Sequence, residues 1–227
     1  PELSSPAIPE STSVGATVQA GLSDVSVHVV DWRLAALAVW LVGLVVLGLF
    51  LLITNLRFSL QLKSDRRMTN ISRYPLPVYV SSMVETPCLY GLFHPAIYVT
   101  HEAQEDEKTL CHVLEHEATH YRHGDHIWAI LRGVCLVLHW YNPLVWLAAS
   151  LSKRDAELAC DEGTIKRIGE ELRGDYGRSL IGLTCKKRTA RTFLITATTM
   201  TGSKKGIQER VMLIAKQPKT ALYTLVA

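Results

Sequence analysis

The sequence predicts an α+β fold that is mainly α-helical, with a transmembrane helix followed by a helical domain that contains a small β-sheet. Three observations support this class. Residues 34–53 carry no charge and no strongly polar group. Residues 74–100 hold short β-branched runs separated by prolines and glycines. From residue 101 onward, apolar residues recur mostly at helical spacing.

The composition of the chain limits its class. Its 227 residues are enough for one sizeable domain with an appendage. The 24 Lys and Arg against 21 Asp and Glu give a formal charge of +3, so no direct nucleic-acid contact is expected. The five cysteines form no CxxC pair. This argues against a disulfide scaffold and a cysteine-based zinc site, and it suits a reducing compartment.

Residues 1–31 are rich in Ser, Pro, Ala and Gly and contain no Lys or Arg. This composition predicts an extracytoplasmic loop or linker rather than a packed helix. The chain begins with Pro, and no basic start precedes an apolar run of the usual kind. We therefore expect a processed product or an internal fragment, and no signal peptide.

The apolar run at residues 34–53 predicts a transmembrane helix over residues 32–56. At 1.5 Å per residue the run spans about 30 Å, the thickness of the bilayer's hydrocarbon core. A buried core helix is the alternative, but such helices usually carry a polar stripe. Lys and Arg are absent before the run except for Arg33, and they are frequent after it. The chain is therefore expected to run from outside to inside, with residues 57 onward on the cytoplasmic side.

Between residues 74 and 100, pairs such as Val78 and Val80 lie two apart in short runs. This spacing predicts two or three short strands of a small sheet. The prolines in this stretch favour an edge over a central place in that sheet. Such an edge could accept an extended peptide as an added strand, although an ordinary sheet covering a helical core is the simpler interpretation.

His116-Glu117-Ala118-Thr119-His120 is an HExxH sequence. On a helix, positions i and i+4 share one face, so both imidazoles can point at one cation. Zinc suits two imidazoles, a carboxylate and an open position, and it brings the pKa of a bound water close to neutrality. Glu117 would accept the proton of that water and pass it to the leaving amine of a cleaved peptide.

HExxH alone is a weak signal, and a third ligand is the test of it. Glu157 lies 157 − 120 = 37 residues after His120, far enough for one helix to end and a second to return antiparallel. Asp161 is one turn further along and is expected to hold a ligand imidazole through its other ring nitrogen. The alternative is a solvated charged helix face, but the presence of HExxH favours the ligand interpretation.

Several residues beside the motif have open roles. His112 is expected to support a ligand or to face solvent. Gly124 is typical of a helix C-terminus. Asp125 is expected to orient a ligand, with capping of the next helix as the alternative. Arg122 and His126 are alternative groups for stabilising an oxyanion, and the sequence does not decide between them.

Residues 128–150 are apolar enough to suggest a second membrane span. However, Arg132 and His139 interrupt the run, and Asn142-Pro143 breaks a helix. We therefore predict a buried or membrane-apposed helical hairpin. It would hold the HExxH helix against the Glu157 helix, close to the bilayer.

Three segments, HEATHYRHGDHIW, HWYNPLVWLA and RDAELACDEG, together resemble the membrane-embedded regulatory metallopeptidases of the bla/mec antirepressor type. The resemblance covers about residues 34–215 and includes PCLYGLFHPAIYV and GSKKGIQERVMLI. It implies a gluzincin-type zinc metallopeptidase domain over residues 57–215. In this domain His116, His120 and Glu157 would bind Zn2+ and Glu117 would be the catalytic base.

The resemblance also implies partners and a location. Family members sit in the bacterial plasma membrane, sense a β-lactam or another envelope signal, and cut a cytoplasmic target. The implied partners are a protein or peptide substrate, including the chain itself and a transcriptional repressor, and the lipid bilayer. A homodimer is an open alternative. No penicillin-binding sensor domain is recognisable, so antibiotic sensing is not expected of this chain.

Two segments near the C-terminus carry further expectations. Residues 186–193 are basic and are expected to form a flexible loop facing lipid phosphates, with a self-cleavage segment as the sharper alternative. Residues 216–227 resemble the start of a further membrane helix. The chain is therefore expected to be one peptidase domain with its entry helix, cut from a longer membrane protein.

Two other functions stay open at this point. A housekeeping membrane-protein protease of the prenyl-processing or heat-stress type shares the HExxH plus ExxxD plan, although HWYNPLVW and the outside-to-inside order favour the regulatory family. A non-catalytic signalling scaffold with structural zinc belongs to another class. Glu117 argues against a scaffold, because a structural site has no use for that carboxylate beside its ligands.

Overall fold

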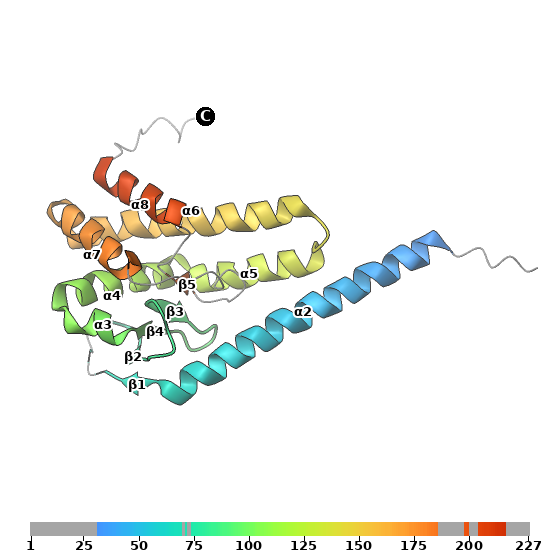
Figure 1. Cartoon of the computed structure of the whole chain (residues 1–227), viewed down its shortest axis with the longest axis horizontal. Helices are drawn as coiled ribbons and strands as arrows, with labels where there is room; N and C mark the ends of the chain where they lie inside the picture. The colour runs from blue at the N-terminus through green and yellow to red at the C-terminus, as the bar shows by residue number, and fades with distance from the viewer. Residues whose placement is uncertain (1–30, 70, 72–73, 186–197, 200–203, 217–227) are drawn as a thin grey trace, which may run out of the picture. The chain divides into compact units, whose positions relative to one another are not determined.

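The computed structural model describes residues 31–69, 71, 74–185, 198–199 and 204–216 (Figure 1). The expectations for the N-terminal linker, the basic segment and a further membrane helix fall mostly on residues 1–30, 186–197 and 217–227, which lie outside the described residues. The described chain is mainly helical and has one small mixed sheet, so the predicted fold class is confirmed.

One long helix precedes the first four strands, and a series of helices follows them, with one more short strand before the last helix. In chain order the elements are α2 (Trp32–Asp65), β1 (Arg67–Met68), β2 (Val78–Val80), β3 (Cys88–Tyr90), β4 (Ala96–Val99), α3 (His101–Glu105), α4 (Glu107–His123), α5 (Asp125–Leu138), α6 (Pro143–Ile168), the 3-10 helix η1 (Glu170–Leu172), α7 (Arg173–Cys185), β5 (Thr198–Thr199) and α8 (Lys204–Lys216).

Among the described residues, α2 is the one helix that is long and apolar enough to cross a membrane. It continues past its apolar run to Asp65, whose carboxylate accepts hydrogen bonds from Ser82 N at 2.7 Å and Ser81 Oγ at 2.9 Å. Contacts divide the chain within α2, into Pro1–Leu41 and Val42–Ala227. All contacts described below lie within the second of these units.

The sheet has the strand order β1-β2-β4-β3-β5, in which β2 and β4 pair parallel and the other pairs are antiparallel. The strands predicted from residues 74–100 are present, but their expected edge location is wrong, because the edges are β1 and β5. Pro77, Pro87 and Pro95 stand just before β2, β3 and β4. A proline there precedes the strand, so it leaves the strand's own ladder of hydrogen bonds intact.

The sheet has two covered faces. One face packs on the helices in a core that includes Val78, Leu89, Ile97, Val99, Val113, Leu114, Ile165, Tyr176, Leu180 and Ile214. The other face carries Cys88, Ala96 and Tyr98, which pack against Leu62 near the end of α2. Helix α4 lies between the sheet and α6, so this core fixes which side of α4 faces α6.

The helix boundaries follow the predicted signals. Gly124 ends α4 in the left-handed conformation, with φ 71°, as expected for a glycine at this position. Asn142 caps α6 by accepting a hydrogen bond from Leu144 N at 2.9 Å, and Pro143 is the first helical residue. The break predicted at Asn142-Pro143 is therefore confirmed, and α5 and α6 pack together as a helical hairpin.

Candidate metal centre

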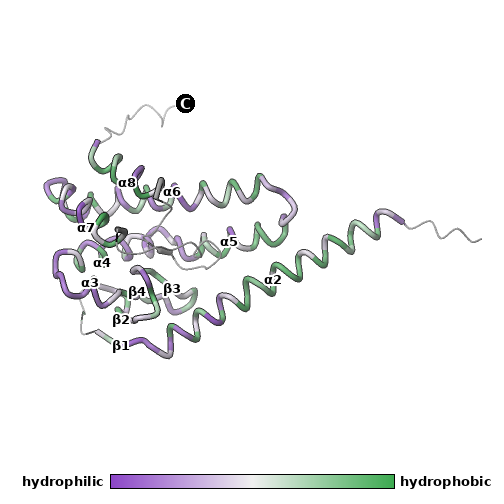
Figure 2. Tube along the Cα trace, viewed as in Figure 1, coloured by the Kyte–Doolittle hydropathy of each residue, from purple (hydrophilic) through white to green (hydrophobic). Residues whose placement is uncertain are grey.

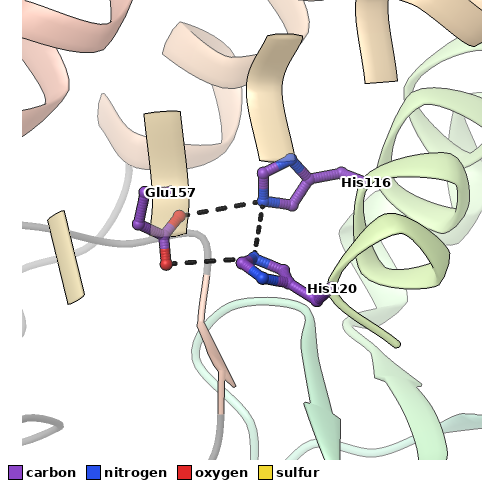
Figure 3. A group of neighbouring side chains, drawn as sticks. All are labelled: His116, His120 and Glu157. Atoms are coloured by element: carbon purple, nitrogen blue, oxygen red, sulfur yellow. Dashed lines mark hydrogen bonds and ion pairs between the residues drawn. The ribbon is translucent and has the colours of Figure 1, made fainter. Parts of the chain in front are cut away.

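The three residues predicted as metal ligands come together in the fold (Figure 3). His116 and His120 lie one turn apart on α4, and Glu157 lies on α6, which packs against α4. All three side chains are buried. The two histidine Nε2 atoms are 3.0 Å apart. Glu157 Oε2 lies 3.7 Å from His116 Nε2, and Oε1 lies 3.9 Å from His120 Nε2.

The spacing of these donors fits a tetrahedral ion, because donors about 2.0–2.1 Å from Zn2+ lie about 3.3 Å from one another. A second group, His120, Asp125 and Cys160, also gathers its ligand atoms within 4.8 Å. There, however, burial and then Asp125 raise the pKa of the Cys160 thiol well above its ordinary value, which disfavours the thiolate that a metal needs. The first group is therefore the better candidate centre.

Glu117 is buried beside these donors, and no described group makes a well-formed hydrogen bond to either of its carboxylate oxygens. Burial raises its pKa to about 8, which outweighs the lowering by His120 and by the nearby backbone of Leu89. A buried carboxylate with a raised pKa beside a cluster of donor atoms is a sign of function.

Asp125 lies against the outer nitrogen of His120, as predicted. Its Oδ2 atom is 2.7 Å from His120 Nδ1. Burial alone would raise the pKa of Asp125, but the hydrogen bond with His120 lowers it overall. The αL turn at Gly124 begins α5 directly after α4, and this turn brings Asp125 back onto the helix it follows. The contact fixes the ring so that Nε2 faces the other donors.

Asp161 supports His116 through an intermediate group that the sequence did not reveal. The hydroxyl of Tyr176 on α7 donates to Asp161 Oδ1 at 2.5 Å, and this hydroxyl oxygen lies 2.8 Å from His116 Nδ1. The direct distance from Asp161 Oδ1 to His116 Nδ1 is 3.4 Å. The hydroxyl therefore bridges the carboxylate and the imidazole.

Arg210 of α8 reaches the same cluster, and the sequence did not single it out within GSKKGIQERVMLI. Its side chain is buried, and it binds Asp161 through Nε and Nη2, each at 2.7 Å. Its Nη1 atom lies 2.9 Å from Glu157 Oε2. Burial alone would raise the pKa of Glu157, but Arg210 and then His116 hold it below its usual range. Glu157 is therefore an anion, which is the form that binds a metal.

The other residues flanking the motif have different partners. Arg122 pairs with Glu115 at 2.9 Å on the helix surface. His112 lies 2.9 Å from a serine hydroxyl of α7. His126 is buried and stacks on Tyr121, and its Nδ1 has no hydrogen-bond partner among the described atoms.

Comparison with known proteins identifies the family of the chain. A family model described as BlaR1 peptidase M56 matches residues 4–214. The regulatory protein BlaR1 of Bacillus licheniformis is 25% identical over 197 residues, which cover 79% of this chain and 32% of that protein. The methicillin resistance mecR1 protein of Staphylococcus aureus is 25% identical over 142 residues, or 62% of this chain and 24% of that protein.

The chain thus spans about a third or less of the length of these relatives. The family match itself covers nearly all of the chain, and it confirms the resemblance inferred from the motifs. The chain belongs to the BlaR1 peptidase M56 family, a family of membrane regulatory peptidases.

Proposed function

We propose that the protein is a membrane-anchored, zinc-dependent endopeptidase that cleaves peptide bonds on the cytoplasmic side of the bacterial plasma membrane. The observation that carries this proposal is the buried set of His116, His120 and Glu157 donors beside the buried carboxylate of Glu117. Two imidazoles, one anionic carboxylate and an adjacent free carboxylate are the groups that zinc-dependent hydrolysis requires.

The proposed arrangement in the membrane follows α2. Residues 32–56 cross the bilayer, residues 1–31 lie outside, and residues 57–215 form the peptidase domain inside. The basic residues after the apolar run support this direction, because Lys and Arg concentrate on the cytoplasmic side of membrane helices.

In the proposed mechanism, His116 and His120 would hold the ion through Nε2, and Glu157 would hold it through its carboxylate. When bound, Zn2+ would act as a Lewis acid and would lower the pKa of a water molecule so that it becomes a nucleophile at neutral pH. Asp125 and Tyr176 each hold the Nδ1 side of one imidazole, so that both Nε2 lone pairs face inward. Arg210 holds Glu157 through Oε2 and stabilises its negative charge.

Glu117 is the proposed general base. One of its oxygens accepts the proton of the attacking water, and the protonated carboxyl then donates it to the leaving amine. No ligand role is assigned to Glu117, since it follows His116 directly and lies beside the donor set.

The proposed first substrate is the chain itself, and the proposed second substrate is a transcriptional repressor. Strand β5 pairs antiparallel with β3, with Thr199 opposite Cys88 and Thr198 opposite Leu89. The backbone of Leu89 lies near Glu117. A strand that is added to a sheet edge is a common way to hold an extended peptide. The antiparallel pairing of β5 with β3 is the observation that supports self-processing.

The test compares the purified full chain with the variant Glu117→Gln in lipid nanodiscs. Mass spectrometry measures the fragments, and elemental analysis measures the zinc. We expect the original chain to hold zinc and to be cut near residues 186–199, and the variant to hold zinc and stay intact. Cleavage by the variant would exclude Glu117 as the base. Absence of zinc from the original chain would exclude the site, and an intact, zinc-loaded original chain would favour a scaffold.

A further inference from the structure

The α5–α6 hairpin exposes a row of large apolar side chains. Six of them are each at least 40% exposed in the described structure: Leu131, Val134, Leu138, Leu144, Leu147 and Leu151. Figure 2 shows hydrophobic colour along α2 and again along α5 and the first half of α6. A contiguous apolar surface of this kind marks a site that is covered by another apolar phase or by a partner.

The part of the hairpin between Arg132 and Lys153 also carries no charged side chain. Residues 133–152 contain no Asp, Glu, Lys or Arg, and Arg132 and Lys153 flank them. These two flanks lie at the same level, because Arg132 Nη1 donates to Ser152 Oγ at 3.2 Å across the hairpin. Each arm from flank to tip has about ten residues and a length of about 15 Å, which is half the hydrocarbon thickness of a bilayer.

The contacts between α2 and the hairpin give an independent measure of depth. The indole of Trp140, at the tip, packs so closely on Gly43 that a Cβ there would overlap it. Gly43 lies at the centre of the apolar run 34–53. Further along, Gly48 faces Val137. Five residues lead from Gly48 to the end of the run and five from Val137 back to Arg132, each about 7.5 Å.

Many backbone N–H and C=O groups of the turn at the tip form hydrogen bonds within the hairpin. Such pairing is required inside the hydrocarbon layer, where no water is present to replace it. His139 N donates to Cys135 O at 3.0 Å, and Asn142 N donates to His139 O at 2.9 Å. The side chain of Asn142 accepts from Leu144 N, and Pro143 removes a donor at the helix start. The indole of Trp146 donates to the carbonyl of Trp140 at 3.0 Å. Such a turn can leave water at little cost.

We infer that the α5–α6 hairpin enters the hydrocarbon layer beside α2 as a re-entrant unit, with its tip near the midplane and lipid acyl chains on its exposed apolar face. The inference rests on the proposed anchoring by α2. Arg132 and Lys153 then lie where the hydrocarbon ends. Glu157 lies one turn, about 6 Å, beyond Lys153 along α6. The metal centre therefore faces the membrane surface, and the inferred substrates are polypeptide segments held next to the bilayer.

Two native cysteines provide the test, because both are free and exposed: Cys135 in the hairpin and Cys111 on α4. The full chain is reconstituted into liposomes as single-cysteine variants with a spin label at Cys111, at Cys135 or at an introduced Val45→Cys in α2. Electron paramagnetic resonance measures collisions with oxygen, which concentrates in lipid, and with a water-soluble nickel complex. We expect Cys135 and position 45 to be oxygen-accessible and nickel-protected, and Cys111 to be nickel-accessible.

Each other outcome overturns a stated part. Nickel access at Cys135 with a lipid-like position 45 overturns the re-entrant hairpin and leaves the anchor intact. Nickel access at position 45 overturns the anchor itself. Protection of Cys135 from both reagents means that protein, such as a second copy, covers the hairpin instead of lipid. Labelling of the unmodified chain with a membrane-impermeant maleimide, mapped by peptide mass spectrometry, gives the Cys111-to-Cys135 comparison without any substitution of the buried cysteines.

Discussion

The guanidinium of Arg210 forks onto the carboxylate of Asp161, with Nε and Nη2 each 2.7 Å from it. The third nitrogen of the same side chain lies 2.9 Å from Glu157 Oε2. One residue of α8 thus contacts both acidic side chains that α6 contributes to the candidate centre. This relationship makes the position of α8 part of the geometry of the site.

Arg210→Gln is therefore expected to weaken zinc binding by about 10–100-fold, the usual effect of removing a group that supports a metal ligand. The measurement is zinc retention in a chelator titration. Arg154→Gln is the matched control, since Arg154 forms the other ion pair between α6 and α8, with the neighbouring Glu209. Equal loss of zinc in both variants would mean that α8 docking matters and the contact of Arg210 with Glu157 does not.

Tyr176→Phe removes the hydroxyl that bridges His116 and Asp161. We expect a loss of about 1–3 kcal/mol in the free energy of unfolding, because buried partners are left unpaired. We also expect a smaller stabilisation of the protein on addition of zinc. Chemical denaturation with and without zinc measures both effects. Tyr141→Phe, at an exposed position, is the control and should change stability by less than about 0.5 kcal/mol.

Glu117 gives a pH dependence in the metal-free protein. Burial in the folded protein raises the pKa of Glu117 from its ordinary value of 4.5 to about 8. The folded state thus holds a proton that the unfolded state releases between these values, so stability falls as the pH rises from about 4.5 to 8. Glu117→Gln removes this penalty. Its melting temperature in chelator should exceed that of the original chain by a margin that widens up to pH 8 and then levels; a constant margin would contradict the prediction.

Gly43→Ala tests the close approach of α2 and the hairpin. An added Cβ would overlap the indole of Trp140, so we expect a lower melting temperature in nanodiscs. Gly133 lies in α5, and no atom lies within 4 Å of a Cβ placed there. Gly133→Ala should therefore stabilise the chain by about 0.5–1 kcal/mol through helix propensity. A melting temperature unchanged by Gly43→Ala would mean that Trp140 moves aside freely.

The helical parts of the candidate centre could be predicted because their signals are local. His116 and His120 share a face by their spacing, and the ExxxD pattern pointed to Glu157 and Asp161. Gly124 and Asn142-Pro143 marked helix ends because glycine and proline restrict the backbone in known ways. Asp125 lies five residues after His120, so its contact with that imidazole is also local in the chain.

Tyr176 and Arg210 could not be predicted in the same way. Each reaches the centre from a separate helix, and neither has a spacing relative to α4 or α6 that a periodic pattern would mark. The strand order was also out of reach, since the pairing of β2 with β4 and of β3 with β5 depends on contacts between distant segments. The prolines misled the assignment of edge strands because they belong to the loops that enter the strands.

The position of Arg210 along the chain has a chemical consequence. It follows β5, so any peptide bond cut between Cys185 and Lys204 would place Arg210 and Glu157 on separate polypeptides. Before such a cut, α8 belongs to the same polypeptide as α6, and this covalent connection raises its effective concentration at the centre. After the cut, Arg210 would stay only as long as the packing of α8 on α6 and α7 holds it. A single hydrolysis would thus turn a built-in component of the centre into one that can dissociate.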